Sequence, residues 1–270
     1  MMHLGVLDQV PHFRGRTAAE AIQESVLLAR EAEHLGYQRF WIAEHHNLGH
    51  FACGAPEILV AAIAAQTTTM RVGSGGVMLP NYSPLKVAET FRLLNTLYAG
   101  RIDLGLGRST GANGLAAQVL QPYLPPGLTG EQDPYLQQVR VLLAFLAEDQ
   151  DTRQEPPAAE TPYPGVRAVP VGAPTPEVWL LGSGQGSAAV AASLGLSFSF
   201  AQFVHARPEP RILETYRRNF RPSRHLPSPR TSLAVRVLCA ESAEEADRLA
   251  RSFWQVCMGV HQRMAAGTYP

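Results

Sequence analysis

The chain has 270 residues, 46% hydrophobic and 17% charged, so it can bury a substantial core. Its formal net charge is zero and it has no basic block, which argues against nucleic acid as a partner. It contains no uncharged apolar run long enough for a membrane span and no secretion signal at its start. The three cysteines are Cys53, Cys239 and Cys257. They are scattered without a CxxC spacing, which predicts a reduced, cytoplasmic protein.

Strand and helix patterns alternate through the first part of the chain. A capping box, Thr17-Ala-Ala-Glu20, opens the first helix, and a proline near the first position opens each of the next two. Short apolar runs between these helices indicate buried parallel strands. The pattern predicts strands at residues 4–7, 40–43, 70–77 and 101–106, and helices at 17–35, 55–66 and 83–98.

The second part of the chain continues the alternation between longer connections. Residues 107–133 and 149–177 are long connections, which we interpret as excursions over the surface. Around them, the pattern predicts strands at 178–181, 196–202 and 233–239, and helices at 135–148, 187–194, 208–220 and 242–264.

This alternation predicts the fold class. Strands and helices that alternate strictly form a parallel sheet with right-handed crossovers. A closed barrel of eight such units needs roughly 250 residues. The pattern contains seven strands, so we expect an α/β fold of the TIM-type (β/α)8 barrel class that lacks its C-terminal eighth unit. The barrel would be a single domain over residues 1–270, and an open doubly wound sheet is the structural alternative.

The second predicted strand ends in an acid and two histidines, Glu44, His45 and His46. Parallel α/β proteins bind ligands at the carboxyl ends of their strands. A histidine with a pKa near neutrality serves as base, acid or hydrogen-bond donor, so we predict these residues in an active site. Surface or packing histidines are one alternative. A metal site of Glu44, His46 and His50 is another, although adjacent histidines lack the helical spacing of the common zinc motif.

The third predicted strand ends in Ser74-Gly75-Gly76. Two glycines let a flat ligand or another backbone approach closely, so we predict contact between this segment and a planar group. A bulge or a tight turn in the strand would explain the same glycines.

Two further strand ends carry candidate phosphate contacts. Arg108 lies among small residues after the fourth strand, where a guanidinium suits a phosphate. Ser183, Gly184 and Ser187 lie between the fifth strand and an alanine-rich helix, whose first N–H groups can hold a phosphate. The next strand ends without the acidic residue of a dinucleotide site. This argues against NAD bound in that mode and favours a phosphorylated planar cofactor such as FMN.

The chain resembles the bacterial luciferase-like flavin-dependent monooxygenase family in three motifs that occur in order: FWIAEHHN, VGSGGVMLPNYSPLKVAETFRLL and GRIDLGLGRSTG. The resemblance runs from about residue 4 to residue 249. It implies a TIM-type barrel that binds reduced FMN, or in some branches a deazaflavin. It places His45 at the family's catalytic histidine, with His46 as its neighbour. It also implies a cis peptide between Gly75 and Gly76 beside the isoalloxazine ring, and phosphate contacts from Arg108, Ser183, Gly184 and Ser187.

The resemblance implies an oxidoreductase of monooxygenase type. Such an enzyme takes reduced FMN from a separate flavin reductase and uses O2 to oxidise a small organic substrate. A homodimer is expected, with no metal, nucleic acid or membrane as partner. Family members usually continue through an eighth strand and a closing helix. Because this chain is shorter, a non-catalytic flavin-binding protein made from a shortened barrel is the alternative.

Overall fold

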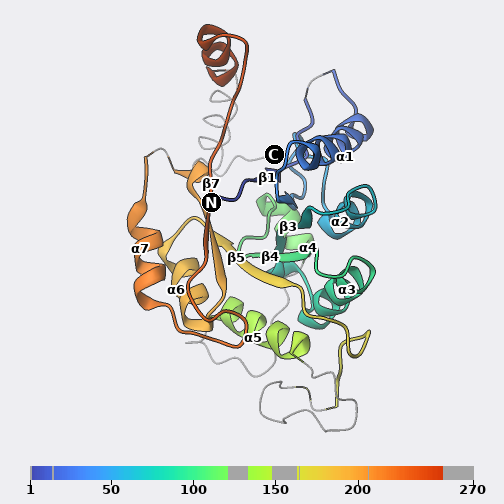
Figure 1. Cartoon of the computed structure of the whole chain (residues 1–270), viewed down its shortest axis with the longest axis vertical. Helices are drawn as coiled ribbons and strands as arrows, with labels where there is room; N and C mark the ends of the chain where they lie inside the picture. Colours follow the sequence, from blue (N-terminus) through green and yellow to red (C-terminus); the bar gives the residue numbers. More distant parts are fainter. Residues whose placement is uncertain are drawn as a thin grey trace.

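The computed structural model of the chain contains the predicted alternation of strands and helices (Figure 1). Most of the excursion predicted at 149–177, and the part of the last predicted helix beyond residue 251, lie outside the described residues. The structure describes residues 2–13, 15–120, 133–147, 163, 165–205 and 207–251.

Seven strands in the described residues form one parallel sheet, in the order in which they occur along the chain. Within the same residues, β1 and β7 do not pair with each other. This order excludes the doubly wound alternative, in which the strand order reverses at a switch point, and confirms the predicted TIM-type barrel with seven strands. The strands are β1 (Gly5–Asp8), β2 (Arg39–Ile42), β3 (Arg71–Met78), β4 (Ile102–Gly107), β5 (Glu177–Gly182), β6 (Ser197–Ala201) and β7 (Thr231–Ala234).

Helices connect the strands and cover the outer face of the sheet (Figure 1). Two short 3-10 helices, η1 (Leu79–Asn81) and η2 (Gln202–Val204), follow β3 and β6 directly. The α-helices between the strands are α1 (Ala18–His34), α2 (Pro56–Ala64), α3 (Pro84–Leu97), α4 (Gly114–Leu120), α5 (Pro134–Leu146), α6 (Gln185–Leu194) and α7 (Pro210–Asn219).

The helix ends follow the predicted capping signals. At the start of α1, the Thr17 hydroxyl accepts from the Glu20 N–H and the Glu20 carboxylate accepts from the Thr17 N–H, so the capping box is confirmed. Gly36, Gly100 and Gly195 follow α1, α3 and α6 with φ angles of 84°, 77° and 63°, a left-handed conformation that favours glycine. These glycines let each helix end and the next strand begin at once.

Two predicted boundaries are wrong. α4 lies inside the segment predicted as a loop, where the Asn113 side chain accepts from the Ala116 N–H and so caps a helix the pattern did not indicate. β7 spans residues 231–234 rather than 233–239, because its pairing with β6 ends at Ala234. Beyond that point the chain turns away from the sheet (Figure 1).

A charged and aromatic network fills the barrel at the N-terminal ends of the strands. Asp103 is fully buried, and its carboxylate accepts hydrogen bonds from Arg39 Nε, at 2.9 Å, and from Trp41 Nε1, also at 2.9 Å. Arg71 Nε donates to the same carboxylate at 2.7 Å, and Glu177 pairs with Arg39 at 2.7 Å. Because side chains fill this end, the C-terminal strand ends form the mouth at which a ligand would enter.

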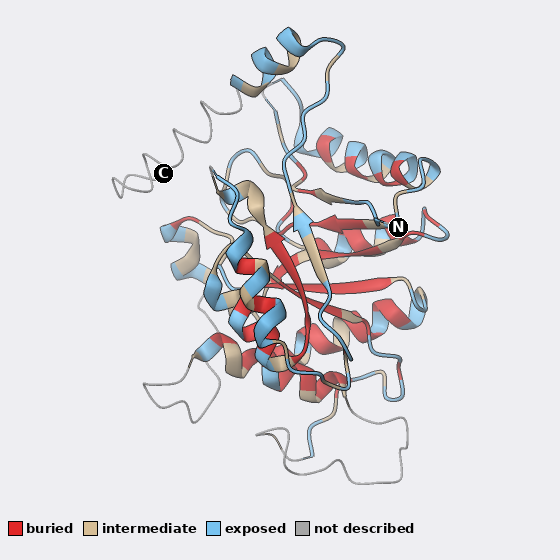
Figure 2. Cartoon of the chain, turned by 60° about the vertical axis from the view of Figure 1, so that its left-hand side comes forward, coloured by how far each residue is buried: buried red, intermediate tan, exposed pale blue. Residues whose placement is uncertain are grey.

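The hydrophobic core lies between the sheet and its helices, and Figure 2 shows the inner strands mostly buried, whereas none of the residues of β7 is buried. In α6, buried alanines let the helix backbone lie close to the sheet. The fully buried outward-facing strand residues include Phe40, Ile42, Val72, Ile102 and Leu104.

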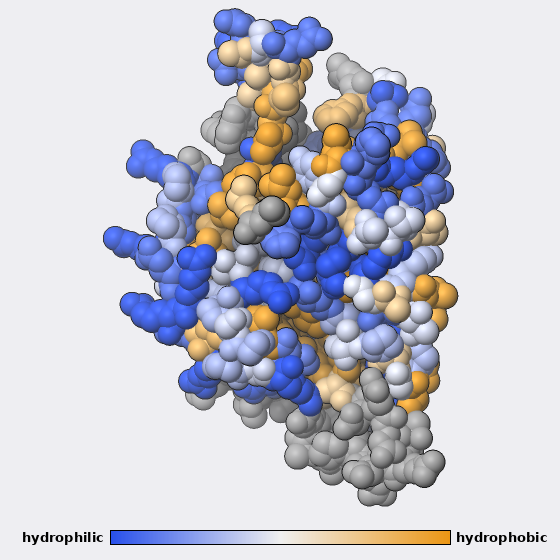
Figure 3. Space-filling model, viewed as in Figure 1, coloured by the Kyte–Doolittle hydropathy of each residue, from blue (hydrophilic) through white to orange (hydrophobic). Residues whose placement is uncertain are grey.

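The segment after β7 is exposed and apolar. Val235, Val237 and Leu238 are 54%, 80% and 40% exposed, and Figure 3 shows hydrophobic side chains along this segment. It leads to a helix over residues 243–251 that stands apart from the barrel (Figures 1 and 2), and Ser242 caps its start by accepting from the Glu245 N–H. Within the described ranges, none of the helices has the length and hydropathy needed to cross a bilayer.

Candidate active site

The predicted site residues follow four neighbouring strands, and their C-terminal ends meet at the barrel mouth. The end of β2 also contacts the loop after β4, although β3 lies between these strands. His46 forms a parallel bridge with Ala112, and its N–H donates to the Gly111 carbonyl at 2.8 Å. The segment after β2 therefore lies across the mouth, where the loops after β3 and β4 begin.

Glu44 is fully enclosed, with no exposed surface. Its carboxylate accepts from the Met78 N–H at 3.0 Å, the Tyr82 hydroxyl at 2.9 Å and His46 Nε2 at 2.7 Å. Burial, together with the Glu44 charge, raises the pKa of the Tyr82 hydroxyl, so this phenol stays protonated as a donor. The geometry makes Glu44 a buried acceptor that ties the end of β2 to the end of β3.

His46 is oriented by that carboxylate and by close packing. The other ring nitrogen, Nδ1, would lie 3.2 Å from a β-carbon at Gly54, so only a residue without a side chain packs comfortably there. One alternative from the sequence was a metal site formed by His46 with Glu44 and His50. In the described part of the chain, no three His, Cys, Asp or Glu side chains gather as a metal site, and His50 is exposed.

His45 has a different environment. Its buried Nδ1 has no hydrogen-bond partner among the described residues, and its ring stacks on Phe51, with 4.2 Å between ring centroids. Burial, and next the charge of His46, lower the pKa of His45 to about 4. The imidazole is therefore neutral near neutral pH, and it can accept a proton or hydrogen-bond to a ligand.

The glycines at the end of β3 are required by the packing of the strands. A β-carbon at Gly76 would lie 2.7 Å from the Gly105 carbonyl oxygen, and one at Gly75 would collide with Leu7. The pairing of β3 with β4 is irregular here, so the bulge alternative is present. The cis peptide between Gly75 and Gly76, expected from the family resemblance, is confirmed. Ser74 is fully buried, and its hydroxyl donates to the Gly105 carbonyl at 2.8 Å.

The two candidate phosphate contacts lie together. Arg108 Nη1 would be 3.2 Å from a β-carbon at Gly186, so the guanidinium lies against the first turn of α6. Gly184 is the N-cap of that helix, no side chain caps it, and the space beside its α-carbon is open. Ser187, in the same turn of α6, packs against Gly182 at the end of β5, and Asp133 pairs with Arg108 at 3.3 Å.

These residues fit a phosphorylated planar cofactor. An arginine beside uncapped N–H groups at a helix start suits a phosphate, because the helix dipole and the guanidinium both favour an anion. The buried Nδ1 of His45, which has no partner in the part of the chain that the structure describes, is a polar atom that a bound molecule could satisfy.

Sequence patterns did not indicate several neighbours of the site. His205 Nε2 donates to the Ser183 carbonyl at 2.5 Å and so holds the loop after β5. Phe51 contacts His45, and Tyr82 contacts Glu44. The fold brings these residues together, and no local sequence pattern indicates either contact. Asp133 had a readable signal, since an Asp before Pro opens a helix, and it does cap α5 through the Tyr135 N–H.

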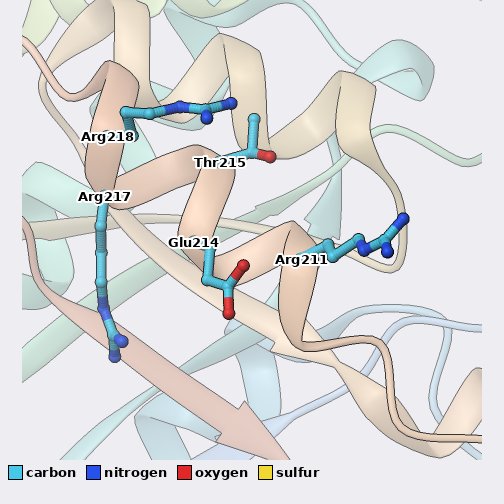
Figure 4. Close-up of a pocket in the computed structure, with 5 residues that line it drawn as sticks. All are labelled: Arg211, Glu214, Thr215, Arg217 and Arg218. Atoms are coloured by element: carbon cyan, nitrogen blue, oxygen red, sulfur yellow. The ribbon is translucent and has the colours of Figure 1, made fainter.

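Two hollows lie on the surface. The larger, about 690 Å³, is on the outer face of α7, and Figure 4 shows Arg217 and Arg218 extending from it in different directions. It is an open helix surface away from the strand ends, so it gives no candidate active site. The smaller, about 220 Å³, lies at the ends of β6 and β7, and its lining includes Phe203, Arg207 and Arg236.

The sequence matches a known family over nearly its whole length. The family model described as luciferase-like monooxygenase matches residues 2–269. A luciferase-like monooxygenase of Escherichia coli (strain K12) is 42% identical over 252 residues, which cover 93% of this chain and 70% of that protein. An N-acetyl-S-alkylcysteine monooxygenase of Bacillus subtilis (strain 168) is 41% identical over 253 residues, which cover 92% of this chain and 71% of that protein.

Solved structures share the same barrel. A crystal structure of apo-MsnO8 has a TM-score of 0.82 and 40% identity, and the match covers 99% of this chain and 74% of that one. The FMN-bound oxygenating constituent of a Pseudomonas putida diketocamphane monooxygenase has a TM-score of 0.68 and 20% identity, covering 98% and 76% of the two chains. An F420-dependent secondary alcohol dehydrogenase has a TM-score of 0.57 and 17% identity, covering 80% and 64%. At these lower identities the likeness concerns the fold alone.

Proposed function

Because the chain belongs to the luciferase-like monooxygenase family, we propose that it is a flavin-dependent monooxygenase that uses reduced FMN and O2 to oxidise a small organic substrate. The observation that carries the cofactor proposal is the position of Arg108 against the first turn of α6. In this proposal a separate flavin reductase supplies the reduced cofactor, because one structural neighbour is itself described as an oxygenating constituent bound to FMN.

Arg108 and the start of α6 would hold the phosphate, with contacts from Ser183, Gly184 and Ser187. The isoalloxazine ring would lie toward the end of β3, beside the Gly75–Gly76 peptide. Ser74 would contribute indirectly, because its hydroxyl fixes β4 behind that segment. A deazaflavin is the alternative cofactor, since one neighbour of the same fold uses F420.

Reduced flavin, when bound, supplies the electrons for the reaction of O2. His45 would accept a proton or donate a hydrogen bond at the reacting centre, and its neutral ring suits either task. His46 and Glu44 would act behind it, because their mutual contact fixes the backbone on which His45 stands. Phe51 would keep water from one face of the His45 ring.

For the substrate, we propose a small thioether or related compound that carries a carboxylate. The support is the 41%-identical relative described as an N-acetyl-S-alkylcysteine monooxygenase. The hollow at the ends of β6 and β7 adds to it, because Arg207 and Arg236 line it beside the Phe203 ring, and guanidinium groups pair with carboxylates.

A titration of the purified protein with oxidised and reduced FMN, followed by O2 and an N-acetyl-S-alkylcysteine, tests the proposal. We expect saturable FMN binding and an oxygen-dependent product in mass spectrometry. FMN binding without any product from a panel of thioethers and carbonyl compounds would instead favour the non-catalytic flavin-binding alternative. Binding of F420 but not of FMN would replace the cofactor.

A further inference from the structure

The segment after β1 contains a residue in a conformation that its side chain disfavours. Val10 has a φ angle of 52°, in the left-handed region, and it is fully buried. Valine is β-branched and rarely adopts this conformation, so the surroundings must enforce it. Such residues are found most often where a fold holds a functional group in place.

Side-chain hydrogen bonds hold this turn. The Asp8 carboxylate accepts from the Val10 N–H at 2.8 Å and from the Ser25 hydroxyl of α1 at 2.6 Å. Asp8 is only 8% exposed, so water competes little for these contacts. The backbone of Val10 is therefore fixed from its N–H side by β1 and α1 together.

Residues 10–12 also pair with residues 50–52, in the segment that follows the two histidines. The Val10 carbonyl accepts from the Ala52 N–H at 3.0 Å, and the His12 N–H donates to the His50 carbonyl at 2.6 Å. Pro11 forms an antiparallel bridge with Phe51 between these two bonds. The segment after β1 thus holds the backbone on both sides of Phe51.

The ring of Phe51 packs on His45 rather than in the hydrophobic core. The two rings stack with a centroid distance of 4.2 Å and an angle of 21° between their planes. Phe51 is partly exposed and does not belong to the core cluster, whereas its neighbour Cys53 does. Core packing therefore does not explain the position of this ring.

We propose that Phe51 is a positioning residue for His45, held against the imidazole by the turn at Val10, and that its ring shields one face of the imidazole from water. The inference rests on the proposed role of His45 and deepens it. In this arrangement the turn at Val10 acts on the His45 ring through Phe51.

Three other ionisable residues lie near His45 or its stacking partner Phe51. His46 follows in sequence and is turned to the Glu44 carboxylate. His50 meets the Phe51 ring edge-on at 6.0 Å. The Cys53 carbonyl accepts from the His45 N–H, and burial raises the pKa of the Cys53 thiol to about 11, so that thiol is uncharged near neutral pH.

The test is an NMR titration of the histidines in the full chain, with and without FMN, for wild type, Phe51→Ala, Phe51→Leu and Asp8→Ala. His45→Gln identifies the His45 signal, and Phe13→Ala is the control, because Phe13 is an aromatic residue 65% exposed outside the site. In Phe51→Ala we expect the pKa of His45 to rise by at least about one pH unit, a tenfold change in its protonation constant. Asp8→Ala should shift it in the same direction, and Phe51→Leu less than Phe51→Ala.

FMN affinity should stay within about twofold in Phe51→Ala, and the acid limb of the oxygenation profile should move upward with the pKa of His45. An unchanged His45 titration in both Phe51→Ala and Phe51→Leu would overturn the inference. The oxygenation assay of the wild type separates the two proposals. If the pKa of His45 rises in Phe51→Ala but the wild type never oxygenates a substrate, the proposed function is refuted and the positioning role of Phe51 stands.

Discussion

Glu44 Oε1 lies 2.7 Å from His46 Nε2, and this contact separates the roles of the two adjacent histidines. His46 is turned into the protein, toward a carboxylate that also holds Tyr82 and the backbone of β3. His45 instead stacks on Phe51, and its buried Nδ1 has no hydrogen-bond partner among the described residues. The pair therefore combines a fixed anchor with a ring that remains available to a ligand.

Replacement of Glu44 by Gln should destabilise the fold. An amide would present an N–H where the carboxylate now accepts from four donors, so a buried donor loses its partner. We expect the free energy of unfolding in urea to fall by about 2–4 kcal/mol. Glu24→Gln is the control, because Glu24 is half exposed and pairs with the exposed Arg16, and it should change stability by less than about 0.5 kcal/mol. Equal losses in both variants would contradict this role of Glu44.

Replacement of His45 by Ala should leave FMN binding intact and slow oxygenation. The proposed phosphate contacts lie after β4 and β5, away from this side chain, whereas proton transfer contributes about 10²–10⁴ in rate. Fluorescence titration gives the affinity for FMN, and single-turnover product formation gives the rate. His50→Ala, at an exposed histidine of the same segment, should keep the wild-type rate. A wild-type rate in His45→Ala would remove His45 from the mechanism.

Replacement of Arg108 by Ala should weaken FMN binding by about 10–100-fold, because a charge-assisted hydrogen bond to the phosphate is lost. Riboflavin has no phosphate, so its affinity should change little in the same variant. Arg218→Ala removes a guanidinium from the outer face of α7 (Figure 4) and should not affect either ligand. Unchanged affinity for FMN in Arg108→Ala would show that the phosphate lies elsewhere.

The fold could be predicted from local signals because they are repeated along the chain. Capping at Thr17, the glycines after three helices and the apolar runs all agree with alternating units. The predicted site also follows from this regularity, because residues that end parallel strands share one mouth. The proximity of Arg108 to α6 is the clearest example, since the two lie after different strands.

Other features depend on contacts that no local pattern encodes. The left-handed turn at Val10 runs against the preference of its own residue type, so sequence reasoning would assign it an extended conformation. The barrel interior is ionic, with Asp103 between Arg39 and Arg71, where branched aliphatic residues would be expected. The sequence allowed two explanations of the glycines of β3, contact with a planar group or a bulge or turn in the strand. The positions of Leu7 and Gly105 were needed to show that strand packing requires these glycines.

Glu33 should make the stability of the fold depend on acid pH. Burial of its carboxylate opposes ionisation, but N–H donors of Met70, Thr69 and Thr68 outweigh this effect and lower the pKa of Glu33 to about 2. Because the folded-state pKa lies below the ordinary value of 4.5, the contribution to stability is present above about pH 4.5. It is lost as the pH falls from there toward about 2.

Glu33→Gln should therefore lower stability near neutral pH by about 1–2 kcal/mol, a value reduced for the screening that water gives this partly exposed group. Its loss of stability between about pH 4.5 and pH 2 should be shallower than that of wild type. Glu31→Gln, at an exposed acid two residues earlier on α1, is the matched control and should keep the wild-type slope. Urea unfolding across this pH range measures both effects. Parallel profiles for wild type and Glu33→Gln would mean that the turn before β3 is held by something other than the Glu33 carboxylate.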